Sequence, residues 1–175
     1  MLYYSGMSEH VTIDRQSFRE AMSRLGAAVN IITTEAAEGA LGFTASAVCS
    51  VTDDPPTLLV CMNRATKLNA AFKAAGILCV NVLSHEQEAL SALFAGGDMP
   101  MAERFAQTGW TRLATGAPVL EAAAASFDCK IDQITEVGTH SVLFCAVVAI
   151  RLGSASSGLI YHGRTYHKIV GADAA

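Results

Sequence analysis

The sequence predicts a mostly antiparallel β-barrel with short helices packed on its outside. Several apolar segments follow one another with turns rather than helices between them, which argues against a doubly wound parallel sheet. Helical periodicity is confined to short segments, and a glycine follows most of them. The 175 residues are 51% hydrophobic, so the chain is long and apolar enough to bury a single core.

A helix is expected first, from Ser17 to Leu25. Ser17 and Glu20 have the spacing of a capping box, and Gly26 follows the last turn. Three apolar strands come next, separated by a turn around Gly39 and by the Asp-Asp-Pro-Pro stop at 53–56. We expect these strands at residues 27–34, 41–51 and 57–62.

Helices and one strand alternate in the middle of the chain. Leu68, Ala71, Phe72 and Ala75 share one helical face, and Gly76 ends that helix. An apolar strand is expected at 77–83, followed by a helix that Ser84 and Gln87 cap and a helical turn at 101–107.

The last third is rich in strands. Residues 127–131 alternate between apolar and polar side chains, and residues 142–150 form the longest apolar run of the chain. Segments 159–161 and 165–170 flank His162-Gly163-Arg164, which is typical of a hairpin. The pattern predicts one domain over 13–175 after a flexible tail at 1–12.

Composition and charge exclude several classes of protein. The formal net charge is −4 and the isoelectric point is about 5.7, so no basic face for nucleic acid is indicated. The longest apolar run is far shorter than the ~20 residues of a membrane-spanning helix. The N-terminus lacks a secretory pattern, so we expect a cytoplasmic protein with no membrane association.

The cysteines and the low charge content bear on packing. The five cysteines are scattered through apolar segments, which favours reduced thiols in the core over disulfides or a zinc site. Charged residues make up 16% of the chain against an average of about 25%, so a buried subunit interface is expected. We find no G-x-G-x-x-G, P-loop, G-x-S-x-G or H-E-x-x-H motif.

Two polar clusters at strand ends are candidates for ligand binding. Residues 42–46, Gly-Phe-Thr-Ala-Ser, could present N–H and O–H groups to a planar ring such as isoalloxazine, or could be a strand end with surface hydroxyls. Residues 63–67, Asn-Arg-Ala-Thr-Lys, precede a helix and could hold a phosphate, or could be an ordinary solvated loop.

Two further clusters follow later strands. Asn81 interrupts an apolar strand, where a buried amide needs hydrogen-bond partners, whereas Ser84 is explained by capping alone. His140, in Gly138-Thr139-His140, precedes a long strand. It is either structural or, beside a ligand, a hydrogen-bond donor or proton source.

The order and spacing of these clusters resemble the flavin reductase-like family over about residues 18–169. The matching stretches include residues 42–51, 55–64, 80–84 and 138–140, together with Phe-Arg-Glu-Ala-Met at 18–22. The family usually has Gly-Asp-His where this chain has Gly138-Thr139-His140, so a role for that Asp is absent here. Within the family, the likeness is strongest to the reductases of pyrimidine utilisation.

The resemblance implies an FMN-binding split barrel that works as a homodimer. It implies that Thr44, Ala45 and Ser46 meet the isoalloxazine edge and that the loop after the third strand holds the phosphate. His140 is expected near the flavin and the nicotinamide as the catalytic residue. The implied flavin contacts are Phe43, Thr44, Ala45, Ser46, Cys61, Asn63, Arg64, Thr66, Lys67, Asn81, Ser84 and Tyr166.

The implied activity is reduction of FMN, or of FAD, by NADH or NADPH, with no metal. The reduced flavin would serve a flavin-dependent monooxygenase, with uracil degradation as the implied pathway. The reductase of an aromatic hydroxylase such as 4-hydroxyphenylacetate 3-monooxygenase and a corrin reductase are alternatives in the same class. A non-catalytic FMN-binding module, or a structural protein that only dimerises, is the alternative from other classes.

Overall fold

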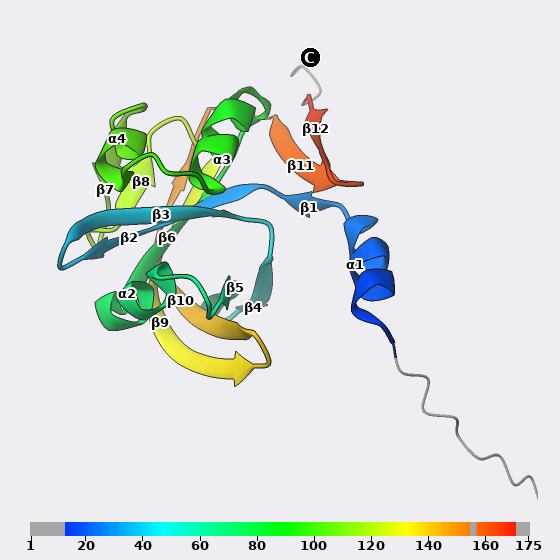
Figure 1. Cartoon of the computed structure of the whole chain (residues 1–175). Helices are drawn as coiled ribbons and strands as arrows, with labels where there is room; N and C mark the ends of the chain where they lie inside the picture. The colour runs from blue at the N-terminus through cyan, green and yellow to red at the C-terminus, as the bar shows by residue number, and fades with distance from the viewer. Residues whose placement is uncertain (1–12, 155–156, 171–175) are drawn as a thin grey trace, which may run out of the picture.

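An antiparallel sheet forms most of the molecule (Figure 1). The computed structural model describes residues 13–154 and 157–170, so the expected tail at 1–12 lies outside the described residues. The helical elements are α1 (Arg15–Ser23), α2 (Leu68–Ala75), the 3₁₀ turn η1 (His85–Gln87), α3 (Glu88–Phe94) and α4 (Met101–Phe105). The strands are β1 (Ala27–Ala28), β2 (Asn30–Ala36), β3 (Gly39–Ala45), β4 (Val48–Asp53), β5 (Pro56–Asn63), β6 (Ile77–Val82), β7 (Trp110–Arg112), β8 (Pro118–Leu120), β9 (Ala125–Val137), β10 (His140–Leu152), β11 (Gly158–His162) and β12 (Thr165–Ile169).

The main sheet has seven strands in the order β3-β2-β6-β9-β10-β5-β4, and every neighbouring pair is antiparallel. Its two edge strands, β3 and β4, are consecutive in the chain and are joined only by Ser46 and Ala47. Because the three Cα steps from Ala45 to Val48 span at most about 11 Å, the sheet curls so that its two edges come close together at this point. The expected strand at 41–51 is therefore divided in two at Ser46.

The sequence located most elements but placed some ends wrongly. The first helix begins at Arg15 rather than Ser17, because the Asp14 carboxylate accepts hydrogen bonds from the N–H groups of Gln16 and Ser17. The expected stop at Gly76 is confirmed, since Gly76 caps α2 with a φ of +67°. Ser84 and Gln87 form the expected capping box.

Strands β7 and β8 were not expected. They form a separate two-stranded sheet in which Trp110 lies opposite Leu120. Each strand has only three residues, too few for an alternating pattern to emerge. The predicted hairpin at the C-terminus is confirmed: β11 pairs with β12, and β1 adds a third strand to that small sheet.

Two buried clusters hold the sheet and helices together. The first fills the inside of the curled sheet and includes Ile32, Val60, Phe72 and Leu143. The second lies under α3, α4 and the C-terminal hairpin, and includes Ile31, Leu83, Phe94 and Leu159. Residues on β2 alternate between the two clusters, so this strand has apolar side chains on both faces.

The helix α1 stands away from the curled sheet (Figure 1). It has no buried residue, and its apolar side chains Phe18 and Met22 are 58% and 47% exposed. Its contacts with the C-terminal hairpin are polar: Glu20 pairs with Arg164 at 2.8 Å, and the Gly163 N–H donates to the Ser23 carbonyl. No helix in the described part of the chain is both long and apolar enough to cross a membrane.

Candidate functional site

A cavity of about 290 Å³ opens where the two edges of the sheet meet. It lies between the end of β3, the end of β5 and the start of β10. Ligand pockets usually have about 300–1,000 Å³, so this cavity can enclose a ring system but leaves a larger ligand partly outside. Its walls are Phe43, Thr44, Ala45, Ser46, Ala47, Cys61, Met62, Asn63, Thr66, Leu68, Phe94, Ala95 and His140.

Eight of the expected site residues are among these thirteen. They come from all three segments around the cavity, so the structure brings together clusters that are far apart in the sequence. These eight are Phe43, Thr44, Ala45, Ser46, Cys61, Asn63, Thr66 and His140.

The end of β3 presents one polar wall that is fixed from behind. The Thr44 hydroxyl donates to the Ser91 carbonyl at 2.6 Å, so its proton is used and only its lone pairs remain for a ligand. The Asn30 side-chain amide donates to the Ala45 carbonyl at 3.2 Å. The segment is thus held by β2 and α3 and needs little rearrangement to receive a flat ring.

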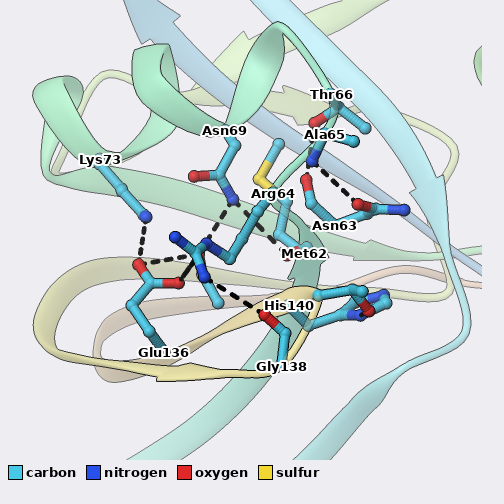
Figure 2. Close-up of polar contacts among 12 residues, drawn as sticks. Met62, Asn63, Arg64, Ala65, Thr66, Asn69, Lys73, Glu136, Gly138 and His140 are labelled. Carbon is cyan, nitrogen blue, oxygen red and sulfur yellow. Dashed lines mark hydrogen bonds and ion pairs between the residues drawn. The ribbon is translucent and has the colours of Figure 1, made fainter.

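The loop after β5 is built as a compact turn. The Asn63 side-chain oxygen accepts from the Ala65 N–H at 2.9 Å, and the Thr66 hydroxyl donates to the Asn63 carbonyl at 3.0 Å (Figure 2). The following helix α2 has Lys67 at its N-cap position with no side-chain hydrogen bond to its first turn. The Asn69 N–H donates to the Thr66 carbonyl at 3.2 Å, and the start of α2, which no side chain caps, is otherwise suited to an anion.

The Arg64 side chain lies on the turn between β9 and β10 rather than in the cavity. Its Nε is 3.1 Å from the Glu136 carboxylate, and its Nη1 donates to the Gly138 carbonyl at 3.2 Å (Figure 2). Glu136 also accepts from Lys73 and from the Ser141 hydroxyl. The hydrogen bond from Lys73, followed by that from Ser141, lowers the pKa of Glu136 below its usual range, so this carboxylate is charged at neutral pH.

His140 begins β10 directly at the cavity. Its backbone pairs with Asn63 on one side and Val137 on the other, which brings it beside the loop after β5. Its Nδ1 is 2.9 Å from the Thr139 hydroxyl. This hydrogen bond leaves Nε2 as the ring nitrogen available to a ligand.

Tyr166 borders a second, smaller cavity of about 210 Å³. Thr44, Ala45, Ser46 and Ala95 line both cavities, so the two share one wall. The Tyr166 hydroxyl is 2.9 Å from the Ser91 hydroxyl, and its ring meets Tyr161 edge to face. The aromatic pair thus extends the site toward the C-terminal hairpin.

Asn81 and Ser84, two of the expected flavin contacts, do not line either cavity. Asn81 is fully buried: its amide donates to the Ile31 carbonyl at 3.1 Å, and its oxygen accepts from the Leu120 N–H at 2.8 Å. Ser84 is 4% exposed and caps η1. Both side chains have partners within the protein in this structure. Lys67 and Arg64 are likewise outside the cavity wall.

Sequence reasoning missed the apolar walls of the site. Phe94, from the end of α3, packs on Gly42, where an added Cβ would come within 3.0 Å of its ring. Leu68, from the first turn of α2, also lines the cavity. Both residues belong to ordinary apolar helix faces, so the glycine in the middle of β3 was the one available signal of a close approach.

The cysteines are only partly in the core. Cys79, Cys129 and Cys145 are buried, and burial raises the pKa of Cys145 to about 12. Cys49 is exposed because β4 is an edge strand with outward-facing residues, so its expected place in the core is wrong. Burial also raises the pKa of Cys61, which keeps this cavity-lining thiol protonated at neutral pH.

In the described residues, no cluster of three or more metal-ligating side chains is present.

Residues 22–170 match the flavin reductase like domain. The chain belongs to the flavin reductase-like family. Two similar relatives are each named FMN reductase (NADH) RutF. The protein of Variovorax paradoxus (strain S110) is 60% identical over 157 residues, covering 90% of this chain and 87% of the relative. The protein of Escherichia coli (strain K12 / DH10B) is 55% identical over 158 residues, covering 90% of this chain and 96% of the relative.

A solved flavin reductase has the same fold. It is BorF, the flavin reductase component of a bacterial two-component tryptophan halogenase. It superposes with a TM-score of 0.84 at 27% identity, covering 91% of this chain and 100% of BorF. The mostly β architecture with short helices is therefore that of the family, as the sequence predicted.

Proposed function

We propose that this protein is an NADH-dependent FMN reductase that supplies reduced FMN to a partner monooxygenase in uracil degradation. The observation that carries the proposal is the cavity at the sheet edges, where the expected flavin-contacting segments of β3, β5 and β10 come together. The relatives named FMN reductase (NADH) RutF support both the activity and the pathway. We assign its action to the cytoplasm, where NADH is available.

The residues around the cavity fit a flavin. Phe43, Met62 and Phe94 supply apolar walls for the ring, while Thr44 and Ser46 supply polar atoms at one edge. The phosphate would lie at the loop with Thr66, beside the uncapped start of α2. Arg64, on the same loop, would supply a cation there after leaving Glu136.

The reaction makes small demands on the protein's own acids and bases. When bound together, the nicotinamide and the flavin supply the hydride donor and acceptor themselves. The chain must hold the two rings at about 3–3.5 Å between reacting atoms and keep water out, which is a positioning task. The fixed end of β3 and the aromatic side chains perform it. His140 would donate a hydrogen bond from Nε2 to the ring system at the cavity.

The working unit in this proposal is a homodimer of split barrels. Val51 on β4 and Val148, Ile150 and Leu152 on β10 are 47%, 43%, 55% and 78% exposed. We name these four side chains the apolar face. Alternate residues of a strand point to the same side, so the β10 members form one continuous stripe. A second molecule of this protein would pack against this stripe and against the exposed side of α1.

The test is a kinetic assay with the purified protein. Mixed with FMN and NADH, it should consume NADH in an FMN-dependent way, followed at 340 nm. Each flavin, FMN and FAD, should be tested with NADH and with NADPH, and the NADH and FMN combination should be fastest. FMN binding without NADH loss would instead identify a non-catalytic flavin-binding module, and absence of FMN binding would leave only a structural role.

The pathway needs a separate test. The reductase should support uracil oxidation when combined with a flavin-dependent monooxygenase that acts on uracil. Stronger support of 4-hydroxyphenylacetate hydroxylation or of corrin reduction would assign it to one of those systems instead.

A further inference from the structure

Glu136 lies at the centre of a small charged network outside the cavity. Its carboxylate accepts from Lys73 on α2 and from Arg64 on the loop after β5 (Figure 2). It also accepts from the Ser141 hydroxyl on β10. Ser141 is itself held by the Asn69 amide, which donates to its hydroxyl at 3.1 Å. Asn69 and Ser141 are both buried, so this side of the network is anchored in the fold.

The network binds its two cations differently. Lys73 comes from the last turn of α2, and its side chain is 27% exposed, whereas the Arg64 side chain is 52% exposed and extends from a loop. If Arg64 leaves, Glu136 keeps the hydrogen bonds from Lys73 and Ser141 and is not left unpaired. The exchange of Arg64 for another partner is therefore inexpensive for the carboxylate.

Arg64 has a second position available. In the structure it does not line the cavity, but it lies two residues before Thr66, beside the uncapped start of α2. A phosphate at that position would attract the guanidinium, and the two would pair in a bidentate way. To reach the phosphate, the guanidinium must first leave Glu136.

We propose that Glu136 competes with the flavin phosphate for Arg64 and thereby weakens FMN binding so that the reduced flavin can be released. This inference rests on the proposed function, in which FMN is a diffusible substrate that has to leave the protein for its partner. When the phosphate departs, the Glu136 carboxylate pairs with Arg64 again, which favours release of FMN. This competition concerns only the phosphate contact of the flavin.

The experiment compares Glu136→Gln with wild type by flavin fluorescence quenching. Gln is similar in shape and keeps an oxygen for Lys73 and Ser141, but it loses the charge that holds Arg64. We expect the dissociation constant for FMN to fall about two- to fivefold, the effect of removing one exposed ion pair. The dissociation constant for riboflavin, which has no phosphate, should stay unchanged.

Two control variants separate competition from a general change of charge. Glu38→Gln removes the same charge in the β2–β3 turn, at the opposite end of β3 from Ser46, and should leave FMN binding unchanged. Arg64→Ala should weaken FMN more than riboflavin. In that background, adding Glu136→Gln should have no further effect on FMN, because the effect passes through Arg64.

The outcomes are distinct. Weaker or unchanged FMN binding by Glu136→Gln, with wild type binding FMN normally, would overturn the inference and leave the proposed function standing. Equal tightening of FMN and riboflavin would also overturn it, since a competitor for the phosphate contact cannot act on riboflavin. Failure of the wild-type protein to bind FMN at all would overturn the proposed function itself.

Discussion

His140 shows how a single side chain reaches the site through strand pairing. It is the first residue of β10, opposite Asn63 of β5, so the ladder rather than a loop fixes its place at the cavity. The Thr139 hydroxyl holds its Nδ1, where the family usually has the carboxylate of Asp. A neutral hydroxyl orients the ring without adding a charge beside it.

We expect His140→Ala to lower turnover more than flavin affinity. The cavity keeps its other walls, so FMN should bind within about twofold of wild type, whereas loss of a hydrogen bond made during the reaction should lower kcat about 10- to 100-fold. Steady-state kinetics and fluorescence titration measure the two effects. A collapse of FMN binding with kcat maintained would make His140 a flavin ligand only.

Asn81 is a buried polar residue that works entirely inside the fold. Its side chain joins β2, β6, β8 and β9 through Ile31, Leu120 and Ser126. Asn81→Ala should lower the free energy of unfolding by about 2–4 kcal/mol, since it leaves buried donors without acceptors. Ser126→Ala, which removes one donor, should cost about 1 kcal/mol. Urea denaturation measures both, and a smaller loss for Asn81→Ala than for Ser126→Ala would contradict this role.

The buried thiols make stability sensitive to alkaline pH. The pKa of Cys145 rises from an ordinary 9.0 to about 12 on folding, because burial disfavours the thiolate. A raised pKa contributes stability that is complete below pH 9 and is lost as the pH rises toward 12. The urea midpoint should fall over this range, and Cys145→Ala should reduce the slope. An identical slope in the variant would exclude Cys145 as a source.

At the scale of elements, β3 and the end of α3 form a matched pair. Gly42 has no side chain where the Phe94 ring passes, and Phe94 in turn forms a wall of the cavity. An added Cβ would also come within 3.3 Å of the Ile32 carbonyl, so the ring has to move rather than the strand.

Gly42→Ala should therefore change the site through packing alone. Displacement of Phe94 should weaken FMN and riboflavin equally and cost about 1–3 kcal/mol of stability, as overpacking does. Gly158→Ala is the matched control, because its Cβ would meet nothing within 4 Å. Fluorescence titration of the two flavins checks the result, and a loss confined to FMN would be inconsistent with it.

The sequence predicted the elements better than their junctions. The strands were predicted from apolar periodicity, and the helix ends from residues such as Gly76. Both are local signals in the sequence. The division of the strand at Ser46 depends on the curling of the whole sheet, so no local pattern reveals it. The same holds for the site: polar clusters such as 63–67 stood out, whereas Phe94 and the Arg64–Glu136 pair depend on contacts between distant segments.

At the scale of the whole molecule, the apolar face is the feature that a single copy leaves uncovered. Ile150 lies in the middle of its β10 stripe and is 55% exposed. Burying apolar surface is worth about 25 cal/mol per Å², so a face of several large side chains favours association. The low charge content of the sequence pointed to such a face but could not place it on β10.

Ile150→Asp should convert the proposed dimer into monomers. A charge in the middle of a desolvated interface costs more than the contacts around it can offset. Sedimentation velocity measures the change, and Met99→Asp, a similarly exposed apolar site before α4, should leave the mass unaltered. A wild-type protein that sediments as a monomer would refute the assignment of this face.

The detached position of α1 has a consequence for how the protein behaves on dilution. A helix of nine residues without a buried side chain is too short to be stable in water by itself, since isolated helices shorter than about 12–15 residues are marginal. Its remaining stabilisation has to come from whatever covers Phe18 and Met22. If a second copy does so, helix formation and assembly are one equilibrium, and the helical content of this protein depends on its concentration.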